Sequence, residues 1–146
     1  MAIALATSCQ MEHAQLRVLA AETRCLLAAP HPPKDISVLV CLRLKFAHLI
    51  TAHHHGEHGV LLPLLIRSPN GDARRLGTRF KASADLASEV SAHRLRWSLA
   101  RIQREWDAYR AAALDLIDRI EEQIDLEDRE LYPWIDEAGP ELCGFS

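Results

Sequence analysis

One part of the chain, residues 81–132, contains neither glycine nor proline. A single helix over this stretch would be about 75 Å long at 1.5 Å of rise per residue, too long for a domain of 146 residues. A turn must therefore interrupt the stretch, and Asp107 suits the N-cap of the helix that follows it. We expect one helix over residues 85–105 and another over residues 108–131.

Two breaks delimit the helices in the first half of the chain. Three prolines exclude a helix over residues 29–35, and Asp35 lies where an N-cap is wanted. The second break, over residues 67–72, contains another proline and a glycine. Four helices with short connections predict an all-α, up-down-up-down four-helix bundle that takes up residues 1–146 as one domain. The first two helices are expected over residues 10–28 and 36–65.

The composition favours helices and excludes several classes of function. Alanine and leucine together number 43, whereas valine, isoleucine and threonine together number 18, which argues against a sandwich, a barrel or a doubly wound sheet. A net charge of −3 gives no basic footprint for nucleic acid. The longest apolar run, residues 36–50, is interrupted by Arg43, Lys45 and His48, so we expect no membrane-spanning segment.

The cysteines and the first residues indicate the compartment. Cys9, Cys25, Cys41 and Cys143 are widely spaced and form no CxxC motif, so neither a disulfide framework nor a zinc knuckle is expected. The first ten residues lack the basic region of a signal peptide, and their apolar part is too short for one. We expect a cytoplasmic protein.

Titratable side chains share the apolar face of each expected helix. His53 and Glu57 fall inside the apolar stripe of the second helix, four residues apart. Glu127 occupies a core position of the fourth helix, with Gln123 one turn earlier on its flank. His13 on the first helix and His93 on the third helix also lie on apolar faces. The sequence thus offers at least one polar group from every helix to the core.

Burying a carboxylate without a partner costs several kcal/mol or forces it to take up a proton. A bound cation removes that cost, and imidazole together with carboxylate suits iron or manganese better than calcium or magnesium. Taken singly, His13 or His93 is more often a hydrogen-bonded core histidine, and His53 with Glu57 can be an intrahelical pair. The joint pattern over four helices favours a metal site in the core of the bundle.

The order and spacing of these residues resemble the hemerythrin-like (HHE cation-binding) family of the bacterial type. Residues 12–16 are similar to the family's EHxxL on the first helix, and residues 53–57 give its HxxxE, followed by a leucine-proline tail. His93 is similar to the histidine of the third helix. Glu127 and the aromatic-proline tail after it match the fourth helix, where Gln123 stands in place of the family's histidine.

That resemblance implies two non-haem iron ions in the bundle core, joined by an oxo or hydroxo bridge. Glu57 and Glu127 would bridge the ions, and His13 and His53 would bind one of them. His93 would bind the other, together with whatever replaces the missing histidine.

Gln123 is the departure from the family pattern that matters most. An amide oxygen is a weaker donor than imidazole, so we expect the second iron to be held less tightly than the first. His54 is the best-placed spare ligand, and Trp97 is expected to line the pocket and exclude water. His58 is expected on the solvent side of its helix, and Tyr132 is out of phase with the metal ligands.

The resemblance implies a protein that binds or reduces O2, H2O2 or NO, in oxidative or nitrosative stress, with a separate and unidentified reductant. The weaker second site favours turnover of peroxide or NO. The alternatives are a reversible O2 carrier, a metal-dependent sensor module without turnover, and a bundle that has lost its metal.

Overall fold

The computed structural model describes residues 2–83 and 85–136, and they contain helices and no strand. The all-helical class expected from the composition is therefore confirmed. None of the described helices combines the length and the apolarity needed to cross a membrane. In chain order the elements are α1 (Ala2–Leu27), α2 (Ser37–Gly56), the π-helix η1 (Glu57–Leu61), α3 (Leu62–Ile66), α4 (Gly71–Lys81), α5 (Leu86–Arg96), α6 (Leu99–Arg104) and α7 (Trp106–Glu130).

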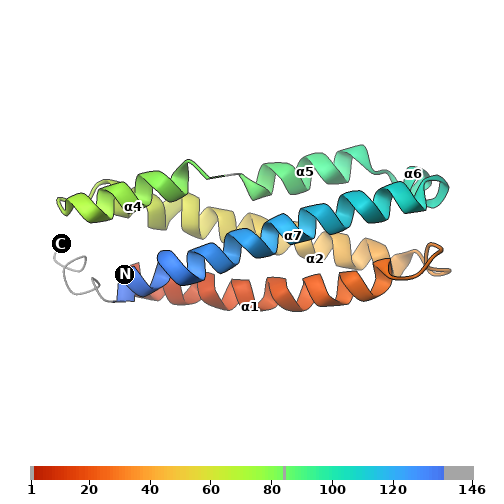
Figure 1. Cartoon of the computed structure of the whole chain (residues 1–146), viewed down its shortest axis with the longest axis horizontal. Coiled ribbons are helices and arrows are strands. Elements are labelled where there is room, and N and C mark those ends of the chain that lie inside the picture. The colour runs from red at the N-terminus through yellow and green to blue at the C-terminus, as the bar shows by residue number, and fades with distance from the viewer. Residues whose placement is uncertain (1, 84, 137–146) are drawn as a thin grey trace.

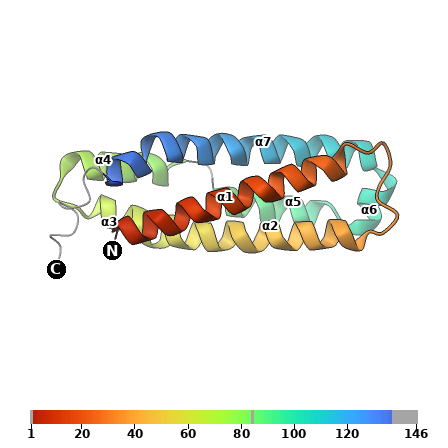
Figure 2. The ribbon, with the colours of Figure 1, turned by 90° about the horizontal axis from the view of Figure 1, so that it is seen from below.

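The helices lie along one another in an elongated molecule (Figure 1). Helix α1 runs along the long axis, and the proline-containing loop at its end leads into α2, which returns beside it. After α3 the chain reverses at the end of the molecule where the N-terminus lies. Helices α4, α5 and α6 then follow one another in the direction opposite to that of α2. Helix α7 then runs back, and α1 contacts both α2 and α7 (Figure 2).

A helix that the sequence analysis did not expect, α4, follows the break at residues 67–72. The side chain of Asn70 caps it by accepting hydrogen bonds from the backbone N–H groups of Asp72, at 2.9 Å, and Ala73, at 3.2 Å. Gly77 lets α4 pack closely on α3, because a Cβ there would lie 2.8 Å from Cβ of Leu65. The segment is therefore a tight turn followed by a packed helix.

The helix expected over residues 85–105 is broken into α5 and α6. Helix α5 ends at Arg96, Trp97 has extended backbone angles, and the Ser98 hydroxyl accepts a hydrogen bond from the Arg101 N–H to start α6. Helix α7 begins at Trp106 after Glu105, so Asp107 lies in its first turn and is not its N-cap. The single helix and the cap at Asp107 were both wrong, because a buried tryptophan followed by a capping serine ended the helix earlier.

The helix expected over residues 36–65 starts within one residue of its predicted position but changes type at Glu57. There the N–H of Leu62 donates to the carbonyl of Glu57, five residues back, which is the hydrogen bond of a π-helix. Pro63 has no N–H to donate to the preceding turn, so regular α-helical bonding cannot continue through it. The wider turn changes the direction in which the side chains around Glu57 point. Helix α1 also begins earlier than expected, at Ala2.

Two apolar clusters form the core of the described residues. The larger cluster runs along α1, α2, α5, α6 and α7 and includes Leu16, Ile50 and Ile124. The smaller cluster lies around α3 and α4 and includes Cys9, Leu61 and Leu131. Along α1, along α2 and its continuation into η1, and along α7, the buried residues between these clusters are polar.

Candidate metal centre

A layer of buried polar side chains separates the two apolar clusters. His13 lies between Cys9 and Leu16 on α1, and Glu127 lies between Ile124 and Leu131 on α7. His53 and Glu57 follow Ile50 on the second pass of the chain. Each of these four polar residues is at most 5 % exposed. Such a layer is costly unless the groups satisfy one another or bind a cation.

The four side chains point their ligand atoms at one place. Nε2 of His13 lies 3.1 Å from Nε2 of His53 and 3.0 Å from Oε1 of Glu127. Nε2 of His53 lies 3.3 Å from Oε1 of Glu127 and 3.3 Å from Oε2 of Glu57. An ion with bonds of about 2.1 Å sets neighbouring ligands about 3.0 Å apart in octahedral and about 3.4 Å apart in tetrahedral geometry. The four residues therefore have the spacing of ligands around one ion.

One proton on His13 is directed away from this place. Nδ1 lies 2.8 Å from Oδ1 of Asp128, and the other oxygen of this carboxylate, Oδ2, accepts a hydrogen bond from Arg17 at 2.6 Å. A carboxylate paired with a guanidinium only accepts, so Nδ1 of His13 carries the proton and donates it. A second proton on Nε2 donates to Oε1 of Glu127, 3.0 Å away, and a metal ion would take the place of that proton, as in carboxylate–histidine–metal arrangements.

Two buried carboxylates, Glu57 and Glu127, share the same histidine partners at the centre. Burial raises the pKa of Glu57, against the effect of His53. Burial would also raise the pKa of Glu127, but hydrogen bonds from His13 and His53 hold it well below its usual range. Burial would lower the pKa of His53, but the Cys9 side chain and both carboxylates outweigh it and raise the pKa to about 12. An imidazolium and a metal cation are thus alternative ways to balance the same negative charge.

Glu57 has one satisfied and one unsatisfied oxygen. The hydroxyl of Tyr132 donates to Oε2 at 2.6 Å, and burial keeps the pKa of this phenol well above its usual range, so it stays a donor. Oε1 is buried and has no hydrogen-bond partner among the described residues. The nearest imidazole to it is that of His58, whose Nε2 lies 3.6 Å away.

A small cavity of about 20 Å³ lies beside Glu57, and it is large enough for one water molecule or ion. Gln123 lines it and donates hydrogen bonds from Nε2 to Oε2 of Glu127, at 2.8 Å, and to the Ser83 hydroxyl, at 3.2 Å. His54 and His58 also line it, and their rings stack with centroids 4.6 Å apart. The full lining is Ile50, His53, His54, Glu57, His58, Leu86, Ala87, Gln123 and Glu127.

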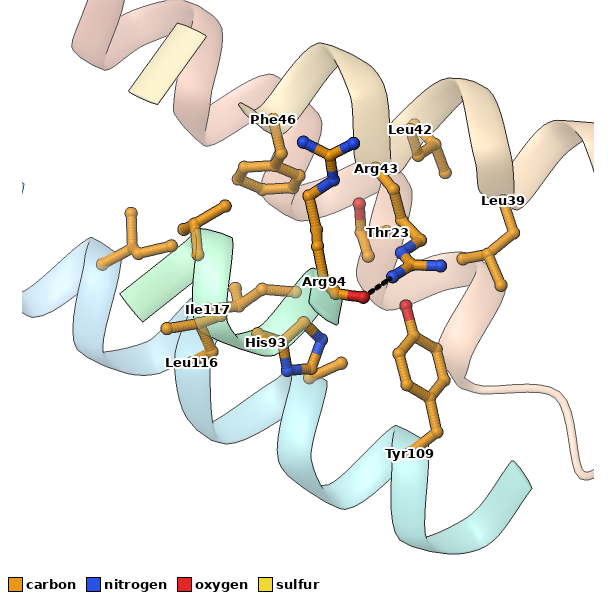
Figure 3. A pocket seen from close by; sticks show the side chains of 13 residues that line it. Thr23, Leu39, Leu42, Arg43, Phe46, His93, Arg94, Tyr109, Leu116 and Ile117 are labelled. Atoms are coloured by element: carbon orange, nitrogen blue, oxygen red, sulfur yellow. Dashed lines mark hydrogen bonds between the residues drawn. The ribbon is translucent and has the colours of Figure 1, made fainter. Parts of the chain in front are cut away.

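The structure does not bring His93 or Trp97 to the centre. The residues of α5 beside the centre are Leu86 and Ala87, and His93 lies about 10 Å further along the helix at 1.5 Å per residue. His93 instead lines a cavity of about 50 Å³ with Arg43 and Tyr109 (Figure 3). The expectation that His93 binds the second iron does not fit this geometry, because α5 starts only at Leu86.

The surroundings of His93 are those of a neutral core histidine. Its ring stacks on Tyr109 with centroids 5.6 Å apart. Burial lowers its pKa to about 4, and the positive charges of Arg43 and Arg96 add to this effect. Trp97 packs edge-on against Tyr109 in the same region, at 5.6 Å, so it does not shield the metal ligands from water.

Sequence reasoning missed three residues that contact the centre. His58 was expected on the solvent side and Tyr132 out of phase with the metal ligands, because a regular α-helical period was assumed through Glu57 and to the end of α7. The π-helix and the end of α7 at Glu130 change those directions. Asp128 carried one usable signal, since it follows Glu127 directly, but its pairing with His13 depends on how α1 and α7 pack.

Comparisons with known proteins add no family to this geometry. The chain matches no protein-family model, and no curated protein or solved structure matches it. What the described residues establish is a buried cluster of His13, His53, Glu57 and Glu127 that could hold a metal ion.

Proposed function

We propose that this protein is a hemerythrin-like non-haem iron protein, with two iron ions in the core of an up-down-up-down four-helix bundle. In this interpretation α1 is the first column of the bundle, and α2 with its continuation through η1 and α3 is the second. Helices α4, α5 and α6 together form the third column, and α7 is the fourth. The observation that carries the proposal is the convergence of four buried ligand atoms from α1, α2, η1 and α7, with the Nδ1 proton of His13 directed outward.

The donor set favours iron or manganese over other cations. Two imidazoles and two carboxylates form the cluster of His13, His53, Glu57 and Glu127, and it contains no thiolate. Thiolates select zinc, copper(I) or iron–sulfur clusters, and sites made only of carboxylates and carbonyls select magnesium or calcium. A mixed nitrogen and oxygen set with two negative charges suits divalent or trivalent iron.

The place for the second ion is the small cavity beside Glu57. Glu57 and Glu127 both line it, so each carboxylate could offer one oxygen to either ion. His58 takes the role that the sequence suggested for His93 or His54, and Gln123 supplies an amide in place of an imidazole. We infer that this second ion is the weaker one, because the His58 imidazole is 3.6 Å from the shared carboxylate and 17 % exposed, and Gln123 supplies only an amide.

An iron pair supplies electrons and open coordination positions for O2, H2O2 or NO. The chain supplies the apolar clusters on both sides of the polar layer, which exclude water from it. The Tyr132 hydroxyl supplies a hydrogen-bond donor that fixes the position of Glu57. Reduction of peroxide or NO consumes electrons, and these would come from a separate reductant that returns the iron pair to its reduced state. We propose reduction of peroxide or NO in stress defence, and the alternatives are a reversible O2 carrier and a sensor without turnover.

The first experiment is to measure iron per chain and the optical spectrum of the same iron-loaded sample. Two iron ions with near-ultraviolet charge-transfer bands support the proposal, and one ion supports the first site alone. Glu127→Gln should lose iron, whereas His55→Gln, a control at an exposed neighbour of the cluster, should retain it. A folded protein that binds neither iron nor manganese would refute the proposed iron centre.

Activity separates the remaining alternatives. Steady consumption of peroxide or NO with a chemical reductant supports an enzyme. Reversible O2 uptake without consumption identifies a carrier, and ligand binding without either identifies a sensor.

A further inference from the structure

A second group of ligand atoms lies on the outer side of His53. Cys9 and Glu12, one turn apart on α1, face Nδ1 of this imidazole, and the three ligand atoms lie within 4.8 Å of one another. The inner centre uses the opposite nitrogen, Nε2. The two groups therefore share one side chain and no ligand atom.

Nδ1 of His53 is an unexplained buried atom. It forms no well-aligned hydrogen bond with the described residues, although the side chain is only 7 % exposed and the Cys9 side chain acts on it electrostatically. Its nearest carboxylate oxygen, Oε1 of Glu12, is 3.4 Å away. A charge-assisted hydrogen bond would be about 2.7–2.9 Å long. Two ligands of one tetrahedral ion with bonds of about 2.1 Å lie about 3.4 Å apart.

Cys9 differs from the other described cysteines in its surroundings. It is 1 % exposed, whereas Cys25 and Cys41 are exposed, and all three are free thiols. Gly56 on α2 lies next to its sulfur, since a Cβ at that position would be in van der Waals contact with Sγ, at 3.6 Å. The thiol is thus held between α1 and α2 at the place where His53 points Nδ1.

We propose that Cys9, Glu12 and His53 form an outer metal site, separate from the inner iron centre, which takes a borderline-soft divalent cation such as Zn²⁺. Sulfur, nitrogen and oxygen in a three-residue set are typical zinc ligands, and a water fills the fourth position of such open sites. Glu12 is 18 % exposed, so the cation and this water reach the site from its side. Binding releases the thiol proton and the Nδ1 proton to solvent, and no electron is transferred. When the inner centre is also filled, His53 bridges the two sites as an imidazolate.

Co²⁺ is the probe that distinguishes this site from the inner centre. Thiolate bound to Co²⁺ gives an intense near-ultraviolet charge-transfer band, which imidazole and carboxylate ligands do not give. We expect the band on adding Co²⁺ to the full chain, and its loss, with at least about tenfold weaker binding, in Cys9→Ser and Glu12→Gln. The matched control is the triple variant Cys25→Ser, Cys41→Ser, Cys143→Ser, which should keep the band.

Two outcomes overturn the proposal: no band in the full chain, or a band that persists in Cys9→Ser. Serine replaces cysteine with little change of volume, and an unchanged circular dichroism spectrum confirms that the variant is folded. The variant Glu127→Gln tests the inner centre separately. If it loses iron and keeps the Co²⁺ band, both proposals stand. If the chain binds no iron but gives the Cys9-dependent band, the proposed function fails and the outer site at Cys9, Glu12 and His53 stands.

Discussion

Asp128 lies behind His13, with Oδ1 2.8 Å from Nδ1, while Oε1 of its neighbour Glu127 lies 3.0 Å from Nε2 on the other side of the same ring. Two consecutive residues of α7 therefore bracket one imidazole of α1. One carboxylate fixes the proton and the ring orientation, and the other shares the inner ligand position. Arg17 holds Asp128 in place from the surface of α1.

We predict that Asp128→Ala weakens metal binding about 10- to 100-fold without unfolding the protein, because His13 loses the acceptor that fixes its tautomer. The measurement is a competition titration with a chelator of known affinity. Asp125→Ala is the matched control: Asp125 also pairs with Arg17, at 2.8 Å, but has no contact with His13. Equal losses in both variants would mean that only the surface charge matters.

The fold was predictable where proline and apolar spacing decide it. The start of α2 follows from the prolines of residues 29–35, and the seam of α7 follows from its isoleucines. The break at Trp97 was not predictable, because tryptophan has an acceptable helix propensity and its exit from the helix depends on packing against Tyr109. Helix α4 was missed because Asn70 was assigned only to the break at residues 67–72, whereas its side chain also caps the helix that follows.

The candidate site was predictable for the residues that lie on a regular helical face. His13, His53, Glu57 and Glu127 were all named from their apolar faces, and the structure gathers them. His93 shows the limit of that reasoning, because a shared apolar face does not fix the depth of a residue along the molecule. The level of α5 is set by where that helix starts, and there Asp85 caps it by accepting a hydrogen bond from the Ser88 N–H.

Gly77→Ala should destabilise the protein, although alanine is the better helix former. The new Cβ would lie 2.8 Å from Cβ of Leu65 and 3.1 Å from the backbone nitrogen of Ile66, so α3 and α4 would have to separate. Overpacking of this kind costs about 1–3 kcal/mol, more than the gain of up to about 1 kcal/mol in helix propensity. Thermal unfolding should show a lower Tm. At Gly71, where the nearest atom is the flexible end of Arg74 at 3.6 Å, the same substitution should be neutral or stabilising.

His93 should make the stability depend on pH between about 4 and 6.5. Burial, with Arg43 and Arg96, lowers its pKa from 6.5 to about 4 in the folded chain. Between these values the unfolded chain binds a proton that the folded chain does not, so the free energy of unfolding is greatest above pH 6.5 and falls as the pH falls towards 4. After allowance for partial exposure, we expect a contribution of about 1–2 kcal/mol.

The test is urea unfolding of the wild type and His93→Gln over this pH range. Glutamine does not titrate, so the variant should lose less stability than the wild type between pH 6.5 and 4. His48→Gln, at an exposed histidine for which no such effect is expected, is the control and should follow the wild type. Parallel curves for His93→Gln and wild type would show that the buried imidazole does not drive the dependence.

Gln123→His should strengthen the second ion of the proposed pair. Gln123 lines the cavity beside Glu57, and its Nε2 already contacts Oε2 of Glu127 at 2.8 Å, so an imidazole there would face the same space. Imidazole is a stronger donor than an amide oxygen, and we expect tighter binding of the second iron and an iron content closer to two per chain. Chelator competition monitored by iron analysis measures this, and Gln103→His, at an exposed position of α6, controls for an added surface histidine. If Gln123→His leaves the second affinity unchanged while the first ion still binds, the second ion does not lie in this cavity.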